Sequence, residues 1–233
     1  TVVMANLAPV LILPLFFKLT PIKNEAMAKR LTDLASRART GVRGVYTMNQ
    51  SAKGTGANAA LMGMGNTRRI VLTDTLVDRY DEVEIEVVLA HELGHHVHGD
   101  IAGGIAVQSI STLVGFYLAS LSLNWAVPTF GFANIYDVAA FPLFALVVGA
   151  FAFAVLPITN GYSRRIETAA DKYALEMTNN PGAFISMMTR LTDQNLGEAS
   201  PARWVEILLY SHPTYAKRVA MARAIAAGDC LNR

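Results

Sequence analysis

The sequence predicts a mainly α-helical protein with a small β-sheet, an α+β fold, joined to two membrane-spanning helices. Two runs without a charged residue, 101–127 and 138–162, are each longer than the roughly 20 apolar residues that a helix needs to cross a bilayer. Apolar residues recur at helical spacing through most of the remaining chain. At 233 residues the chain is long enough for a small core in addition to these spans.

Composition favours membrane spans over the alternative, a buried helical hairpin in a soluble protein. The chain is 52% hydrophobic and only 16% charged, against about a quarter charged in soluble domains. Both uncharged runs are apolar on all sides rather than along one stripe. A net charge of +2 is too small to indicate a nucleic-acid partner, so the lipid bilayer is the expected environment. The single cysteine, Cys230, excludes an internal disulfide and fits a reducing compartment.

The first apolar run, residues 2–17, is shorter than the other two and contains two prolines. Because the chain opens on Thr1 and no basic region precedes this run, we do not expect a signal peptide. We interpret residues 1–17 as a truncated transmembrane segment or, alternatively, as an interfacial helix. All 20 Lys and Arg residues lie outside 101–160, so the positive-inside tendency places both flanking parts of the chain in the cytoplasm.

The segments between the first two apolar runs follow in a clear order. Apolar residues spaced i, i+4, i+7 predict a helix over 24–41, with Gly41 as a suitable end. Residues 41–48 and 68–76 have the composition of short strands, and the glycine-rich stretch between them has a weaker strand signal. A helical pattern then runs from Glu82 to Gly99-Asp100 and is expected to continue into the first span.

The C-terminal part is predicted to be entirely helical. The second span leads into residues 163–177, and Pro181 is a natural first-turn residue for the helix after it. Residues 201–210 and 212–228 have the pattern of two further helices.

A histidine-rich stretch, "VVLAHELGHHVHGDI", lies directly before the first span. His91, Glu92 and His95 form the pattern H-E-x-x-H, in which four residues make about one helical turn. The two imidazoles therefore project from the same face and can bind one zinc ion. Glu92 lies beside that face, where it can take a proton from a water that the metal activates.

The other two histidines of this stretch do not fit the same metal ion. His98 lies about 10.5 Å along the helix axis from His91 at about 1.5 Å per residue, whereas zinc–nitrogen bonds measure about 2.0–2.1 Å. His96 points to a different face. We therefore expect His96 and His98 to be polar or interfacial residues rather than ligands.

A catalytic zinc site needs a third protein ligand and one open position. Glu167 in "SRRIETAAD" is the best candidate, because two antiparallel spans would return its helix to the start of the first span, next to the histidines. Asp171 lies one turn later on the same face, where it can hydrogen-bond a ligand histidine. The alternative is an ordinary helix that exposes both carboxylates to solvent.

His212 precedes Pro213 at the expected start of a helix. One interpretation is structural, since proline suits the first turn of a helix. The other is functional, with His212 donating a hydrogen bond to the oxyanion that forms when a carbonyl is attacked. The pattern of residues alone does not separate the two.

Three motifs, "AHELGHHVHGDI", "SRRIETAAD" and "HPTYAKR", resemble the signatures of membrane-embedded zinc metalloproteases of the CaaX prenyl endopeptidase and HtpX group. The stretch "ANAALMGMGNTRRIVLTDTLV" is more similar to the CaaX branch. The resemblance extends from about Pro14 to Arg223. It implies a gluzincin-like catalytic core, with a small sheet against the active-site helix and membrane helices joined to it.

The resemblance also implies roles for individual residues. His91, His95 and Glu167 correspond to the ligands of one catalytic zinc ion, and Glu92 corresponds to the general base. Asp171 corresponds to the carboxylate that orients a ligand histidine.

Four further positions match residues that surround the substrate. Asn58-Ala59 matches the edge strand along which such enzymes align a peptide by backbone pairing. His212 and Arg218, in the pattern H-P-x-x-x-x-R, match residues near the transition-state oxyanion. The position after Asn58-Ala59 is usually aromatic in this branch but is Ala60 here, so contacts along the edge strand are expected to differ.

The function expected from these observations is that of an integral-membrane zinc endopeptidase. Its expected substrates are peptides or proteins, with prenylated and membrane-bound ones among the candidates. Its expected location is the inner membrane of a bacterium or the endoplasmic reticulum of a eukaryote, with the active site facing the cytoplasm. The alternatives are an HtpX-like quality-control protease of misfolded membrane proteins and a non-catalytic, zinc-stabilised membrane scaffold.

This function implies four segments. They are a truncated transmembrane or interfacial segment (1–17), a first catalytic part with the zinc-binding helix (18–100), a hairpin of two transmembrane helices (101–162) and a helical second catalytic part with the third zinc ligand (163–233).

Overall fold

The computed structural model describes residues 13–63 and 65–228. Most of the first apolar segment, residues 1–17, lies outside these ranges, and its described part includes one helical turn, α2 (Leu13–Phe16). The predicted class is confirmed, because the described chain is mostly helical and contains one small mixed sheet. The strands are β1 (Leu19–Pro21), β2 (Val45–Met48), β3 (Ala59–Met62) and β4 (Arg69–Thr73). The longer helices are α3 (Glu25–Arg37), α4 (Asp74–Arg79), α5 (Glu82–His98), α6 (Asp100–Phe130), α7 (Phe141–Thr178), α8 (Pro181–Gln194), α9 (Arg203–Leu209) and α10 (Tyr215–Ala226).

The sheet has the strand order β1-β2-β4-β3. Its two central strands, β2 and β4, are parallel, and each outer strand is antiparallel to its neighbour. The glycine-rich stretch with the weak strand signal forms β3, which places it at one edge of the sheet. Its register sets Ala59 opposite Leu72.

The core forms between this sheet and the helices around it. Leu31 and Leu34 of α3, Ile70 and Leu72 of β4, and Leu89 of α5 are almost completely buried in one cluster. These side chains recur at helical or alternate spacing in the sequence, so each element buries one face. Burial of apolar surface of this kind is the main favourable term in folding.

The histidine-rich helix α5 begins and ends with clear local signals. Asp81 and Glu84 form a capping box at its start, each side chain accepting from the other residue's backbone N–H. The sequence pattern predicted that this helix continues into the first span, and this prediction is wrong. Gly99 adopts a left-handed conformation (φ 71°) that ends α5 after His98, and α6 begins at Asp100.

Two other helix boundaries differ from the sequence-based expectation. α3 ends at Arg37, and Arg39 with positive φ follows it, so Gly41 lies beyond the helix end. α10 begins at Tyr215, because the Thr214 side chain accepts from the backbone N–H of Lys217 and caps the helix. Pro213 therefore precedes the helix rather than forming its first turn.

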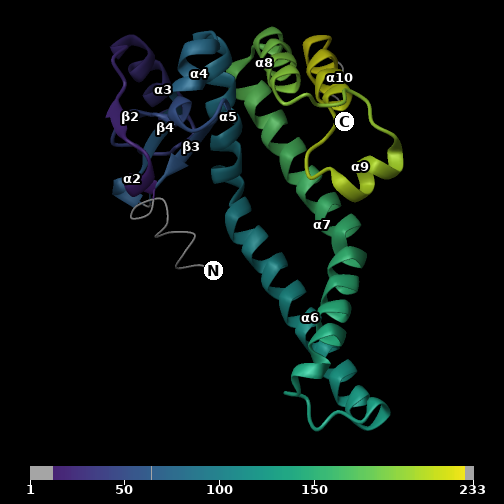
Figure 1. Cartoon of the computed structure of the whole chain (residues 1–233). Coiled ribbons are helices and arrows are strands. Elements are labelled where there is room, and N and C mark those ends of the chain that lie inside the picture. The colour runs from purple at the N-terminus through teal and green to yellow at the C-terminus, as the bar shows by residue number, and fades with distance from the viewer. Residues whose placement is uncertain (1–12, 64, 229–233) are drawn as a thin grey trace.

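Helices α6 and α7 form a long hairpin that projects from the rest of the molecule, with the connector at its far end (Figure 1). Both helices are long and apolar enough to cross a membrane, and only 6% of the most apolar window of each is buried. Helices of this composition in a soluble core would be mostly buried. The exposure of the hairpin therefore argues against the soluble alternative.

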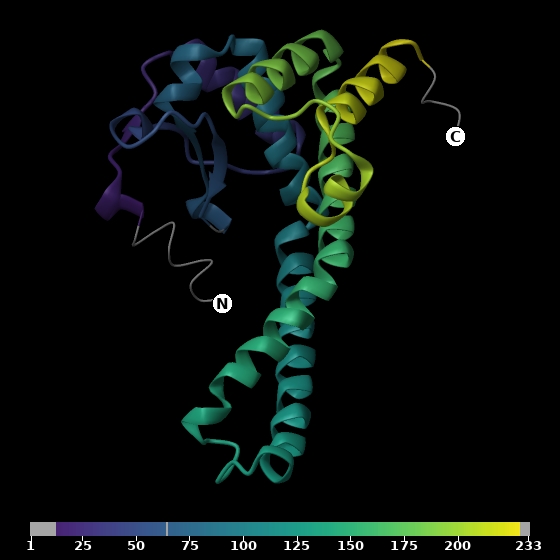
Figure 2. The same cartoon turned by 45° about the vertical axis from the view of Figure 1, so that its right-hand side comes forward.

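Beyond the hairpin, α7 continues back beside α5, as both views show (Figures 1 and 2). The two helices approach closely at Gly94, within the H-E-x-x-H motif. A Cβ atom at this position would lie 3.1 Å from Ala170 Cα, 3.3 Å from Ala170 O and 3.3 Å from Tyr173 Cβ. Gly94 therefore permits backbone-level contact between α5 and α7.

We predict that Gly94→Ala destabilises the protein by about 1–3 kcal/mol, the usual cost of overpacking a close contact. Two of the three atoms that the new methyl group would meet belong to the α7 backbone, which cannot rotate away as a side chain can. Denaturation of the protein in detergent micelles measures this change.

Gly104→Ala is the matched control, because a Cβ at this helical glycine meets no other atom within 4 Å. Alanine favours a helix over glycine, so this variant should be at least as stable as the wild type. Equal loss of stability in both variants would contradict close packing at Gly94.

Candidate metal centre

Two histidines from α5 and one glutamate from α7 converge on a single point. His91 Nε2 lies 3.1 Å from His95 Nε2 and 3.3 Å from Glu167 Oε2, and His95 Nε2 lies 3.5 Å from Glu167 Oε1. These three side chains form the candidate metal-binding group among the described residues. The hairpin thus places Glu167 beside the two histidines, the arrangement that the sequence predicted.

The geometry and chemistry of this group fit a zinc ion. Ligands in a tetrahedral site with bonds of about 2.0–2.1 Å lie about 3.3 Å from one another, close to the three observed separations. Oε2 of Glu167 is buried and has no hydrogen-bond partner among the described residues. A buried carboxylate oxygen of this kind is expensive unless a cation or a donor meets it.

Carboxylates approach the outer nitrogen of each histidine. Nδ1 of His91 lies 2.9 Å from Oδ1 of Asp171, which is fully buried. Arg218 of α10 holds Asp171 through two charged hydrogen bonds, one of them with Nε 2.6 Å from Oδ2. Asp171 therefore lies beside His91, although Nδ1 of His91 makes no hydrogen bond of good geometry among the described residues. Arg218 reaches the centre through the same carboxylate.

The second carboxylate was missed by the sequence analysis. Nδ1 of His95 lies 2.8 Å from Oδ2 of Asp100, the first residue of α6. The available signal was the pair Gly99-Asp100 directly after the motif, because a glycine that ends a helix can turn the next side chain back toward it.

Glu92 lies in the same cavity as His91, Glu167 and His212, a space of about 160 Å³. Burial raises the pKa of the Glu92 carboxyl, and the neighbouring His91 and His95 oppose the rise. A carboxyl group whose pKa is raised toward neutrality is suited to accept and return a proton.

The pKa of His91 is also shifted. Burial of the imidazole lowers it, but the carboxylates of Asp171 and Glu167 outweigh burial and raise the pKa to about 9. In the metal-free protein, His91 is therefore protonated at neutral pH. Metal binding requires the neutral imidazole.

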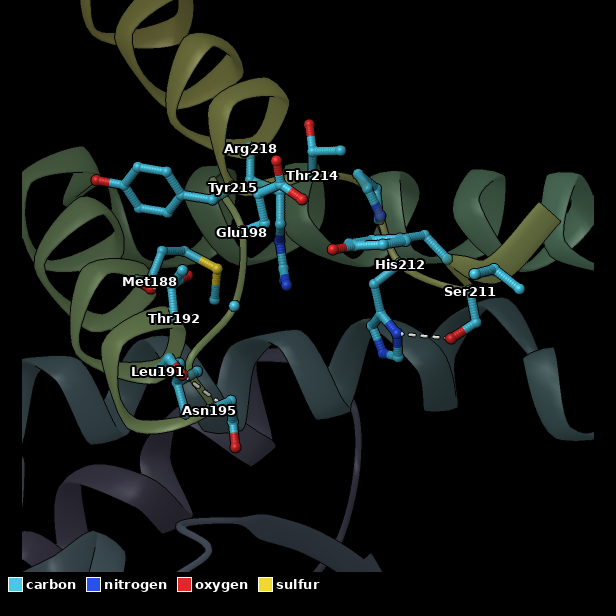
Figure 3. Close-up of a pocket in the computed structure, with 14 residues that line it drawn as sticks. Met188, Leu191, Thr192, Asn195, Glu198, Ser211, His212, Thr214, Tyr215 and Arg218 are labelled. Atoms are coloured by element: carbon cyan, nitrogen blue, oxygen red, sulfur yellow. Dashed lines mark hydrogen bonds between the residues drawn. The ribbon is translucent and has the colours of Figure 1, made fainter. Parts of the chain in front are cut away.

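His212 lies in the segment before α10, on the open side of the centre. Its Nε2 is 3.3 Å from Oε1 of Glu167, and its side chain is 58% exposed. Its Nδ1 is 2.9 Å from Oγ of Ser211 (Figure 3). A second cavity of about 430 Å³ adjoins the first at His212 and Arg218, with Met188 of α8 and Tyr215 of α10 on its walls (Figure 3).

The edge strand approaches the same cavity from the other side, where Asn58 lies on its wall. The backbone of Asn58 is already paired: its N–H donates to Thr73 Oγ1 and its C=O accepts from Thr73 N, both at 2.9 Å. Because pairing alternates along an antiparallel ladder, the N–H and C=O groups of Ala59 and Leu61 point away from β4.

His96 and His98 lie outside the metal-binding group. Burial lowers the pKa of His96, and the charge of Arg68 lowers it further. The exposed His98 ring lies edge-on to Tyr173, with 5.7 Å between ring centroids. Among the described residues, neither histidine belongs to a group of side chains that could hold a metal ion.

Comparison with known proteins identifies a family. The sequence model of Peptidase family M48 matches residues 21–226. The chain is 34% identical over 218 residues to a Bacillus subtilis protein named Uncharacterized metalloprotease YhfN, covering 92% of this chain and 51% of that protein. It is 27% identical over 223 residues to the CAAX prenyl protease 1 homolog of Oryza sativa, covering 94% of this chain and 52% of that protein.

A solved structure has the same fold. The crystal structure of S. mikatae Ste24p matches with a TM-score of 0.84 and 28% identity, covering 95% of this chain and 55% of that one. The chain therefore spans about half the length of these three proteins.

We predict that metal loading releases a proton from His91 at about pH 7, and that this release disappears above its pKa of about 9. Metal affinity should accordingly rise with pH up to about 9. The sign follows from the raised folded-state pKa: in the metal-free fold, the interactions of protonated His91 are fully present below its unfolded pKa of about 6.5 and are lost as pH rises through about 9.

Isothermal titration calorimetry in buffers of different ionisation enthalpy measures the proton count. Titrations at about pH 7 and about pH 10 provide the comparison. An equal count at both pH values would contradict the assignment of this proton to His91.

Proposed function

Because this chain belongs to peptidase family M48, we propose that it is the catalytic part of a zinc endopeptidase that is held in a membrane. The convergence of His91, His95 and Glu167, with Glu92 in the same cavity, is the observation that carries the proposal. Two imidazole nitrogens and one carboxylate, with room for a further ligand, form a typical catalytic zinc site. Residues 18–100 and 163–233 then form one catalytic unit, and the hairpin joins its two parts.

The reaction proposed is hydrolysis of a peptide bond. A zinc ion held by the three ligands would lower the pKa of a water molecule and polarise the carbonyl of the substrate. Glu92 would accept a proton from the attacking water and then donate it to the amine that leaves. Its raised pKa suits both roles, because the carboxyl group must hold the proton between the two transfers.

His212 is positioned to act on the developing oxyanion. Its ring lies in the cavity with His91 and Glu92 and is partly exposed, and Nε2 lies 3.3 Å from Oε1 of Glu167. When Ser211 donates to Nδ1, the neutral ring carries its proton on Nε2, the atom nearer Glu167, from which it would donate a hydrogen bond to the oxyanion. A donor of this kind typically contributes 10²–10³-fold to the rate, as an order of magnitude.

Asp171 and Arg218 would support the ligands rather than touch the substrate. The Asp171 carboxylate lies between the His91 imidazole and the Arg218 guanidinium. Such a carboxylate fixes the orientation of the ring and raises the basicity of the nitrogen that binds the metal.

The substrate would lie along β3. Ala59 and Leu61 offer outward backbone groups at the sheet edge, and Asn58 contributes its side chain to the cavity wall. A peptide added as a further strand would pair with these groups. The cavity of about 430 Å³ beside His212 would receive a side chain from the same peptide (Figure 3).

We further propose that the active site faces the cytoplasm and that the substrates include prenylated C-terminal peptides. The first assignment rests on the absence of Lys and Arg between residues 101 and 160. The second rests on the similarity to proteins named CAAX prenyl protease 1 homolog.

We predict that Glu92→Gln lowers peptide hydrolysis by about 10²–10⁴-fold, the usual contribution of a general base. Glutamine is nearly isosteric but cannot hold the proton, so zinc content should stay at the wild-type level. Hydrolysis of a fluorogenic peptide and zinc content are measured on the same samples.

Glu86→Gln is the matched control, since it lies on the same helix and pairs with Arg30 away from the centre. It should hydrolyse peptide at the wild-type rate. A Glu92→Gln protein that binds zinc and remains fully active would refute the mechanism.

The substrate proposal is tested separately. The protein should cleave a farnesylated C-terminal peptide much faster than unfolded casein, with the non-prenylated peptide as the matched control. Preference for casein would instead favour the quality-control function, and zinc binding without cleavage of any of the three would favour the scaffold.

A further inference from the structure

We propose that Asp100 is a positioning residue that holds His95 for the metal, so that α6 and α7 each supply one supporting carboxylate to the centre. The inference rests on the proposed function, because it concerns the same metal site. It adds a residue that neither the motif nor the resemblance singled out.

The contact between Asp100 and His95 is close and shielded. Oδ2 of Asp100 lies 2.8 Å from Nδ1 of His95, and the two side chains are 16% and 21% exposed. With Nδ1–H donating to this carboxylate, the lone pair of His95 lies on Nε2, the atom that faces His91 and Glu167. Asp100 therefore selects the tautomer and the ring orientation that a metal ligand needs.

The backbone explains how Asp100 reaches back to His95. A continuous helix would carry residue 100 onward, five residues and about 7.5 Å along the axis from residue 95. Gly99 interrupts the helix with φ 71° and ψ 28°, a left-handed conformation that glycine adopts without strain. The chain turns at this point, and the first side chain of α6 returns to the end of α5.

The two ligand histidines are supported in parallel ways. Asp171 of α7 lies 2.9 Å from the outer nitrogen of His91, and Asp100 of α6 lies 2.8 Å from that of His95. The two helices that carry the spans therefore contribute the ligand Glu167 and both supporting carboxylates, from segments just outside the uncharged runs. The proposed metal site is complete only when both α6 and α7 pack beside α5.

A purely structural role is the competing explanation. An acidic residue in the first turn of a helix stabilises the helix through its dipole, whatever it contacts. That role predicts an effect of substitution on stability alone. The positioning role predicts an effect on metal affinity and on the ligand field of the metal.

The experiment uses the full chain in detergent, with wild type, Asp100→Asn and Asp100→Ala. Zinc affinity is measured by competition with a chromophoric chelator, cobalt(II) absorption reports the ligand field, and thermal denaturation of the metal-free proteins reports stability. We expect Asp100→Ala to bind zinc about 10–100-fold more weakly, the range found for such supporting residues. Asp100→Asn should fall between Asp100→Ala and the wild type, because its amide oxygen still accepts from His95.

Asp137→Ala is the matched control, because Asp137 is also an acidic residue at the start of a helix, the short 3-10 helix Val138–Ala140, but lies in the connector away from the centre. Its zinc affinity should equal that of the wild type. Wild-type affinity and cobalt spectrum in both Asp100 variants would overturn the proposal, whether or not their stability falls. The near-isosteric Asp100→Asn decides the outcome if Asp100→Ala does not fold.

Peptide hydrolysis by the wild type is measured in parallel and tests the proposed function alone. A wild type that binds zinc but cleaves no peptide would refute that function, while the order of affinities would still decide the role of Asp100.

Discussion

The close contact between α5 and α7 at Gly94 is the constraint on which the rest of the centre depends. Glu167 lies 72 residues after His95 in the chain, so only helix packing can bring its carboxylate close to the two histidines. Ala170 backbone atoms fit against Gly94 because no side chain separates the two helices. Glu167 lies about one turn before Ala170, and this contact therefore sets its distance from the histidines.

A buried group of charges completes the assembly. Asp171 has no exposed surface, and it is acceptable there because His91 and Arg218 both meet it. Arg218 comes from α10, so the C-terminal helix is fixed to the metal site by the same carboxylate. Removing one member would leave an uncompensated buried charge, which is more costly than losing the contact itself. The active site and the helical core are thus stabilised by shared interactions.

The sequence predicted the parts of this site that follow from periodicity, and it missed those that follow from a single backbone angle or a distant pairing. His91 and His95 share a face because the helical repeat requires it, and Glu167 returns to them because two spans must run antiparallel. Asp100 was missed because a helix continuing past Gly99 would carry it away from His95. The pairing of Arg218 with Asp171 joins residues 47 positions apart. The spacing of residues within a single helix therefore cannot predict it.

The position of the centre beside the hairpin has a consequence for its substrates. Glu167 follows the end of the uncharged run at Tyr162 by five residues, which is about 7.5 Å of helix. Asp100 directly precedes the other uncharged run, which begins at Ile101. Glu167 and Asp100 therefore lie within about two helical turns of the ends of the two uncharged runs. For the proposed peptidase, a peptide anchored in the membrane would already be concentrated beside these residues, whereas a soluble peptide would have to diffuse there from the bulk solution. Effective concentration alone would then favour membrane-tethered substrates.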